Sequence, residues 1–212
     1  MAETDVGAVY DRVADDYADR FPSTEPEQPV ELAMVAHFAA LVAGSGGQVL
    51  DAGCGAGRML PVLAAAGCSP VGIDLSPGMV RRARQDHPEF DVRVGSIGAL
   101  PFPDGSFDGF FSWYSTIHTP DDGLAAVFAE VRRVLRPAGH VLVAFQAGEG
   151  VTEVGQGYRR LGHDVQLHRH DRTPDHVAGE LRTAGFVEVA RLVRAPAAGE
   201  RTDQAVLVAR RG

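Results

Sequence analysis

Lysine and asparagine are absent from this 212-residue chain, so all 20 basic residues are arginines. Without lysine, no Schiff base can form with a carbonyl substrate or with pyridoxal phosphate, which excludes that class of enzymes. The 28 acidic residues give a net charge of −8, whereas a protein that binds the phosphate backbone of nucleic acids presents a basic face. A nucleic-acid partner is therefore not expected.

Long hydrophobic runs and cysteines are also scarce. No run approaches 18 apolar residues, and the first residues are acidic without an apolar core, so neither a transmembrane helix nor a signal peptide is predicted. The two cysteines, Cys54 and Cys68, have neither metal nor redox spacing and fit a reducing compartment. We therefore expect a cytoplasmic protein with no membrane partner and no metal site.

The pattern of apolar residues predicts an α/β protein. Its composition, 45% apolar and 23% charged, is typical of one globular domain over 1–212. Apolar runs alternate with helical patterns, which indicates βαβ units and a mainly parallel sheet. Strands are predicted at 48–51, 69–74, 90–95, 107–112, 139–146, 186–194 and 203–210, and helices at 4–20, 28–43, 56–66, 77–87, 120–136 and 174–184.

Prolines mark several helix ends. Ser76, Thr119 and Thr173 each precede a proline, so each is predicted to be the N-cap of a helix. Pro137 is predicted to end the helix over 120–136.

Two segments fall outside the regular alternation. Residues 148–172 are rich in glycine and histidine with no clear period, and we expect them to form a cap together with residues 1–43. Residues 195–199 are short enough to join the last two strands as an antiparallel hairpin.

A glycine-rich turn is the strongest functional signal. Residues 49–57, VLDAGCGAG, join a strand to a helix, where glycines let the backbone turn tightly and approach a ligand. Asp74 ends the next strand, 21 positions after Gly53, the interval at which an acid accepts hydrogen bonds from a ribose. The dinucleotide-binding pattern needs its third glycine at position 58, which is Arg58 here, so the spacing is G-x-G-x-G.

That spacing, with Asp51 before it and Asp74 after it, resembles the class I S-adenosylmethionine-dependent methyltransferases. Residues 100–108, 130–140 and 10–17 resemble further motifs of this family, in the same order along the chain. The resemblance implies a Rossmann-like, seven-stranded, mostly parallel sheet with helices on both faces and an antiparallel last strand.

The resemblance also implies which residues bind the cofactor. Gly53 and Gly55 would line the methionine portion, Asp74 would hold the ribose, and Ser96 stands where the family often has an aspartate near the adenine. The full set of cofactor contacts that the resemblance implies is Tyr17, Asp51, Gly53, Cys54, Gly55, Arg58, Asp74, Leu75, Met79, Ser96, Ile97, Trp113 and Tyr114.

Two residues are candidates for catalysis. His118 follows the fourth strand and is expected to be a general base that faces the acceptor; the alternative is that it packs against the helix near Pro120. Tyr17 is expected to touch cofactor or acceptor. The histidines of 148–172 suggest a strand that lines the acceptor pocket, or a contact between two copies in a homodimer, rather than a metal site.

These features predict an enzyme that transfers a methyl group from S-adenosylmethionine to an oxygen or nitrogen of a small organic molecule. Two alternatives remain, namely a nucleotide-linked oxidoreductase and a non-catalytic module that binds S-adenosylmethionine. A protein acceptor also stays open.

Overall fold

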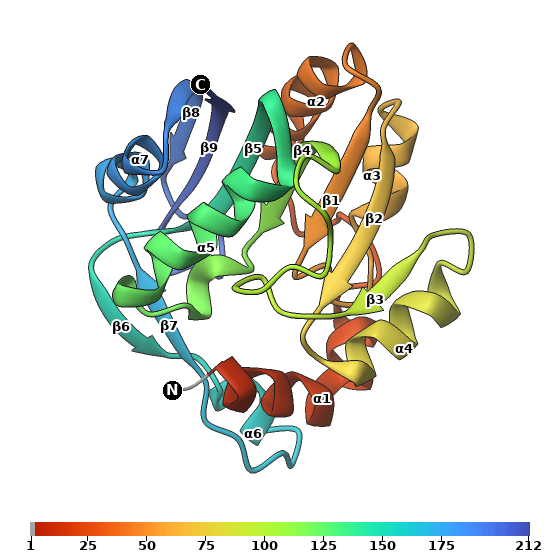
Figure 1. Ribbon diagram of the computed structural model, residues 1–212. Helices are drawn as coiled ribbons and strands as arrows, with labels where there is room; N and C mark the ends of the chain where they lie inside the picture. The colour runs from red at the N-terminus through yellow and green to blue at the C-terminus, as the bar shows by residue number, and fades with distance from the viewer. Residues whose placement is uncertain (1–2) are drawn as a thin grey trace.

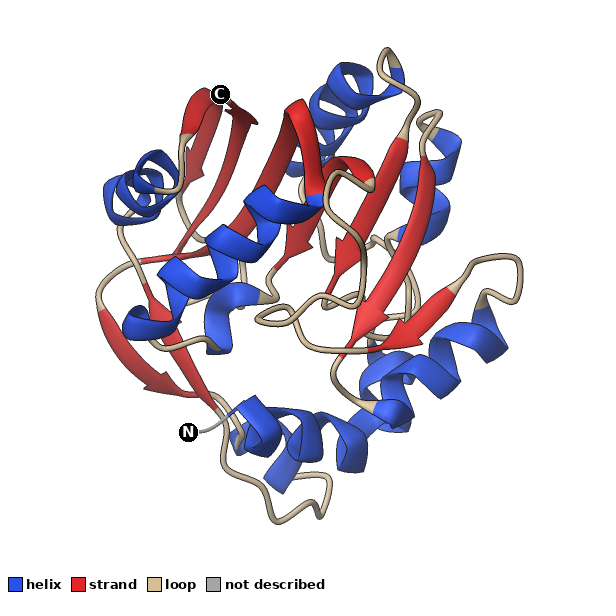
Figure 2. Ribbon diagram, in the orientation of Figure 1, coloured by secondary structure: helices blue, strands red, loops and turns tan. Residues whose placement is uncertain are grey.

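A seven-stranded sheet forms the centre of the protein in the computed structural model, which describes residues 3–212 (Figures 1 and 2). The strand order is β3-β2-β1-β4-β5-β9-β8, and β9 runs antiparallel to the other six strands. The strands are β1 (Gln48–Ala52), β2 (Ser69–Asp74), β3 (Val92–Val94), β4 (Phe107–Trp113), β5 (Leu135–Ala147), β8 (Phe186–Arg194) and β9 (Asp203–Arg211). The predicted fold is confirmed, including the hairpin between the last two strands.

Helices cover both faces of this sheet. On one face, α2 (Pro29–Ala43) and α3 (Leu60–Ala65) pack on a core that includes Phe38 and Phe111, whose ring centroids are 5.9 Å apart. On the other face lie α5 (Asp121–Val134) and α7 (Pro174–Thr183). Helix α4 (Pro77–Asp86) packs beside β2 and β3. Because both faces are covered, every residue of β4 is buried.

The cap lies across the carboxyl ends of the parallel strands (Figure 1). It consists of α1 (Glu3–Arg20), the hairpin of β6 (Gly150–Glu153) and β7 (His168–Asp171), and the short helix α6 (Gln156–Arg159). The expected cap segment 1–43 also included α2, but this helix packs on the sheet, where its apolar side chains join the core. Val9 and Val13 of α1 pack against Val165 and Leu167, which joins the two cap segments. Met1 and Ala2, with which the expected cap segment begins, lie outside the described residues.

Two predicted N-caps are confirmed and one is wrong. The hydroxyl of Ser76 accepts a hydrogen bond from the N–H of Met79, and that of Thr173 accepts one from His176. Thr119 is not an N-cap, because α5 begins one residue later with Pro120 at its N-cap position. Thr119 is instead the C-cap of a 3₁₀ turn, η1 (Thr116–His118).

The end of α5 also differs from the prediction. The helix stops at Val134, and Leu135 is already extended and pairs with Phe107 of β4. Pro137 therefore lies within β5 rather than just beyond the helix. A proline disfavours helical geometry at the preceding residue, so its influence reaches back along the chain.

No helix within residues 3–212 is both long and apolar enough to cross a membrane.

Candidate functional site

A cavity of about 1020 Å³ lies between the cap and the carboxyl ends of the strands. Its lining comes from the glycine turn, the end of β2, the segment after β4, the cap, and the segment between β8 and β9. Ligands of parallel α/β sheets bind at this edge, where the order of the strands reverses. The order here reverses at β1 and β4, so the cavity stands at the expected position.

The glycine turn and Asp74 form one hydrogen-bonded unit. One carboxylate oxygen of Asp74 accepts from the N–H of Gly55 at 2.8 Å, and the other accepts from Ser76 at 2.9 Å. Burial raises the pKa of Asp74, and these backbone donors oppose the rise. Asp74 lines the cavity, and each of its oxygens keeps a lone pair for a ligand hydroxyl.

Asp51 lies beneath the glycine turn with an unpaired oxygen. It is 1% exposed, and its Oδ2 has no hydrogen-bond partner among the described residues. Desolvation raises the pKa of Asp51 to about 7, while Arg58 opposes the rise. An unpaired buried carboxylate is costly, so this site favours a cationic partner.

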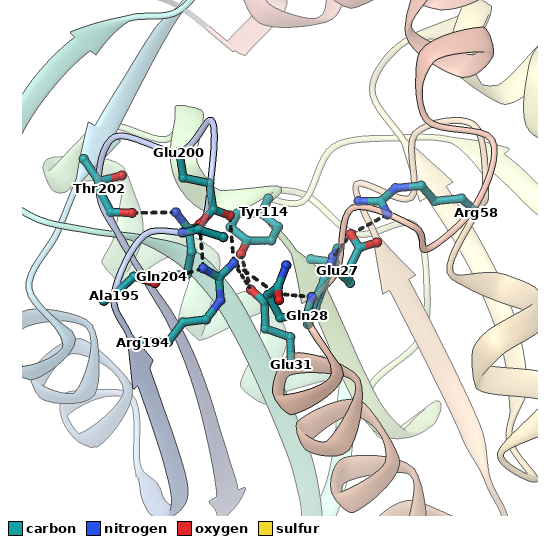
Figure 3. Close-up of polar contacts among 12 residues, drawn as sticks. Glu27, Gln28, Glu31, Arg58, Tyr114, Arg194, Ala195, Glu200, Thr202 and Gln204 are labelled. Atoms are coloured by element: carbon teal, nitrogen blue, oxygen red, sulfur yellow. Dashed lines mark hydrogen bonds and ion pairs between the residues drawn. The ribbon is translucent and has the colours of Figure 1, made fainter.

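Arg58 forms a buried ion pair with Glu27, in the segment between α1 and α2 (Figure 3). The exposed fractions of the two side chains are 14% and 5%. The indole N–H of Trp113 donates to the same glutamate oxygen, Glu27 Oε1, at 3.1 Å, while Glu27 Oε2 has no partner. Arg58 is thus neither fully solvated nor free of a partner, and both side chains of the pair line the cavity.

Tyr10, His118 and His168 form a chain of hydrogen bonds across three elements. His118 Nδ1 lies 2.6 Å from the carbonyl oxygen of His168, and Nε2 lies 2.8 Å from the hydroxyl of Tyr10. A carbonyl only accepts, so Nδ1 carries the proton and Nε2 accepts from Tyr10. Burial lowers the pKa of His118 to about 4, which keeps the imidazole neutral at pH 7.

A second ionic network borders the cavity beyond β4 (Figure 3). Arg194, at the end of β8, donates to both carboxylate oxygens of Glu31 at 3.1 Å and to Glu200 at 2.5 and 2.7 Å. The hydroxyl of Tyr114 donates to Glu31 at 3.0 Å. Tyr114 has a φ of 59°, a left-handed conformation that costs a bulky residue free energy, so its surroundings hold it in place.

Most of the residues expected to contact cofactor line this cavity. They are Tyr17, Gly53, Gly55, Arg58, Asp74, Leu75, Met79, Ile97, Trp113 and Tyr114, and the catalytic candidate His118 joins them. Cys54 and Ser96 do not line it: Cys54 packs with α3 and α4, and Ser96 accepts a hydrogen bond from the N–H of Gly98. Asp51 lies just beneath the lining.

Sequence reasoning missed most of the charged residues that line the cavity. Glu27, Glu31, Arg194 and Glu200 all line the cavity, yet they belong to no recognisable motif. The one local signal is the spacing of Gln28 and Glu31, which forms a capping box at the start of α2. That signal points to a helix end and not to a binding site.

Comparison with known proteins agrees with this geometry. A family model described as a methyltransferase domain matches residues 49–139. The chain is 31% identical over 161 residues to a malonyl-[acyl-carrier protein] O-methyltransferase of Serratia marcescens, covering 70% of this chain and 62% of the relative. It is 36% identical over 126 residues to that of Yersinia pestis, covering 59% and 46%. The chain therefore spans about half to three-fifths of the length of these relatives.

Solved structures share the fold at low sequence identity. Magnesium protoporphyrin IX methyltransferase of Synechocystis, with bound S-adenosylhomocysteine, has a TM-score of 0.73 at 18% identity and full coverage of both chains. The 1,6-didemethyltoxoflavin-N1-methyltransferase of Burkholderia thailandensis has a TM-score of 0.67 at 20% identity, covering 100% of this chain and 91% of the other. In its motifs, its strand order and these matches, the chain is similar to the class I family of S-adenosylmethionine-dependent methyltransferases.

Proposed function

We propose that this protein transfers the methyl group of S-adenosylmethionine to an oxygen or nitrogen of a small organic molecule. The observation that carries the proposal is the cavity, which is lined both by the glycine turn with Asp74 and by the separate ionic network around Arg194. Ligand pockets typically have volumes of roughly 300–1,000 Å³, so the space suits a cofactor together with a small acceptor.

The unpaired buried oxygens fit the cofactor. Asp51 Oδ2 and Glu27 Oε2 are carboxylate oxygens without a partner among the described residues, and an amino acid ammonium supplies both charge and donors. Asp74 would accept from the ribose hydroxyls, with Leu75 and Met79 beside the adenine. The backbone around Ile97 would serve the adenine edge in place of Ser96, whose hydroxyl is occupied by Gly98.

The cofactor supplies a methyl group that its sulfonium already activates, so the chain's own residues need to align the acceptor and exclude water. The hydroxyl of Tyr10 donates a hydrogen bond to Nε2 of His118. The oxygen of this hydroxyl can therefore still accept a hydrogen bond from an O–H or N–H of the acceptor molecule in the cavity. The acceptor proton would pass to Tyr10, and the Tyr10 proton would pass to Nε2 of His118. Tyr17, whose ring meets that of Tyr10 edge to face, would close the site over the cofactor.

We further infer a cytoplasmic protein that handles no nucleic acid, in line with its acidic balance and its two free cysteines. The cap provides the acceptor pocket, and self-association through it into a homodimer remains part of this proposal.

Two experiments test the proposed function. Calorimetry with S-adenosylhomocysteine measures binding, and mass spectrometry of small-molecule mixtures incubated with S-adenosylmethionine detects products 14 mass units heavier, as one CH₂ requires. Binding with no methylated product from any mixture would favour the non-catalytic module. Tight binding of NADH with none of S-adenosylhomocysteine would favour the oxidoreductase.

A further inference from the structure

Three neighbouring strands place polar side chains in a row at the acceptor end of the cavity. Gln146 of β5 is the register partner of Gln204 of β9, which in turn is the register partner of Arg194 of β8. All three line the cavity, together with Glu31, Tyr114 and Glu200. We call these six residues the polar wall; Figure 3 shows its members around Arg194.

The arginine of the polar wall is already neutralised. Its two terminal nitrogens bind Glu31 and Glu200, and its side chain is only 12% exposed. The wall therefore holds two carboxylates against one guanidinium, a formal charge of −1. A carboxylate or phosphate placed here would meet repulsion and find no free cation to bind.

The unpaired atoms show what the wall lacks. Among the described residues, Gln146 Oε1 is buried and has no hydrogen-bond partner. It is an acceptor, so it needs an N–H or O–H donor from a ligand. Arg194 Nε is likewise buried with no partner among residues 3–212, and a ligand oxygen could accept from it. A carboxylate has no N–H or O–H to donate, so it could bind Arg194 Nε but could not satisfy Gln146 Oε1.

Besides Arg58 and Arg194, three further arginines line the cavity. Arg169 forms an ion pair with Asp171 at 2.6 Å. Arg160 and Arg201 are exposed, and water and salt screen such charges. These arginines do not change the formal charge of −1 at the buried polar wall.

We propose that the acceptor presents an uncharged or cationic hydrogen-bond donor, such as an alcohol, amide or amine, to the polar wall, and that the wall rejects carboxylates and phosphates. The proposal rests on the proposed function. It concerns the group that the wall recognises and does not name the methylated atom.

Matched probes test this selectivity on the protein saturated with S-adenosylhomocysteine. One set is tryptamine, tryptophol and indole-3-acetate, and the other is tyramine, tyrosol and 4-hydroxyphenylacetate. Within each set the ring is constant and only the terminal group changes. In both sets we expect the amine or the alcohol to bind at least about tenfold tighter than the acid, as measured by NMR titration. Equal or tighter binding of the acids would overturn the proposal.

A pair of glutamine variants locates the selectivity. Gln146→Met removes an amide whose buried oxygen has no partner in the part of the chain that the structure describes, so the melting temperature should not fall, while the preference over the acid should shrink by about fivefold or more. Gln204→Met is the control, because the Gln204 amide donates to the carbonyl of Thr202 at 2.9 Å and its loss should lower the melting temperature. An unchanged preference in Gln146→Met would contradict the assignment.

The two proposals fail separately in this experiment. S-adenosylhomocysteine binding by the wild-type protein tests the methyltransferase proposal, and its absence would count against that proposal. Normal binding of S-adenosylhomocysteine with no preference among the probes would count against the polar wall alone.

Discussion

Tyr10 and His118 meet across 108 residues of sequence, with the hydroxyl of the tyrosine 2.8 Å from Nε2 of the histidine. Their rings lie edge to face, 5.5 Å apart. The second nitrogen of His118 is held by the carbonyl of His168, so α1, η1 and β7 together determine the tautomer. The cap therefore does more than cover the cavity, because it sets which nitrogen of His118 can receive a proton.

His118→Ala should lower turnover by about 10²–10⁴-fold while S-adenosylhomocysteine affinity changes little. The reason is that the variant removes the group that, in the proposed relay, receives the proton of Tyr10 as Tyr10 takes that of the acceptor. Tyr10→Phe should cause a similar loss, and the double variant should be no worse than either single one if the two side chains act as a unit. The assay needs an acceptor that is protonated at neutral pH. Turnover within threefold of wild type would remove His118 from catalysis.

Buried His118 should also make stability depend on pH. Its pKa is about 4 in the folded protein, chiefly through desolvation with smaller effects from His170 and Arg169, against about 6.5 when unfolded. The unfolded chain thus binds more protons between these values, so stability is complete above pH 6.5 and falls as the pH drops toward 4. The loss should approach about 3 kcal/mol. Urea unfolding between pH 7 and 4.5 should show a smaller decline in His118→Gln than in wild type.

The part of the cavity around the glycine turn was predictable because its signals are local. Residues 49–57 and Asp74 sit at the ends of adjacent parallel strands, and a strand pattern with a glycine turn already places them together. The structure adds that Asp74 binds the N–H of Gly55, a contact that spacing alone does not reveal.

The part of the cavity around Glu31 and Arg194 was not predictable for a physical reason. Glu31 and Arg194 are separated by 163 residues, and their contact depends on how α2 lies over the end of β8. The helical and strand periodicities of the sequence indicate local structure and do not predict a contact between two such distant residues. The error at Thr119 has a similar origin: its carbonyl accepts from the buried Arg172, and the preceding residues form η1, so tertiary contacts override the local N-cap signal.

Asp74→Ala should weaken S-adenosylhomocysteine binding by about 2–4 kcal/mol, roughly thirtyfold to a thousandfold. It should also reduce stability, because the N–H groups of Gly55 and Ser76 lose their acceptor. Asp74→Asn keeps one carbonyl oxygen and should recover part of the stability but less of the affinity. Calorimetry and urea unfolding measure the two effects, and unchanged affinity in the alanine variant would exclude Asp74 from the site.

Gly53→Ala should destabilise the protein by about 2–4 kcal/mol. Gly53 has a φ of 75°, and an added Cβ would lie 2.3 Å from Cβ of Ser115. Gly44→Ala is the control, since Gly44 has an ordinary φ of −66° and a Cβ there would meet nothing within 4 Å. Urea unfolding should leave the control within about 0.5 kcal/mol of wild type. Similar stability for both variants would show that the turn relaxes around the new side chain.

Leu167→Ala should loosen the cap and speed the release of S-adenosylhomocysteine. Leu167 is 1% exposed and packs with Val13 of α1. The same helix carries Tyr10 and Tyr17, which line the cavity. Truncating a buried leucine costs about 2–5 kcal/mol, and here the cost falls on the contact that holds α1 over the ligand. Leu161→Ala is the matched control, because this leucine lies in the same segment but is 54% exposed. Stopped-flow displacement should give a dissociation rate at least about tenfold faster for Leu167→Ala and unchanged for Leu161→Ala. Equal rates in the two variants would mean that the ligand leaves without any opening between α1 and residues 148–172.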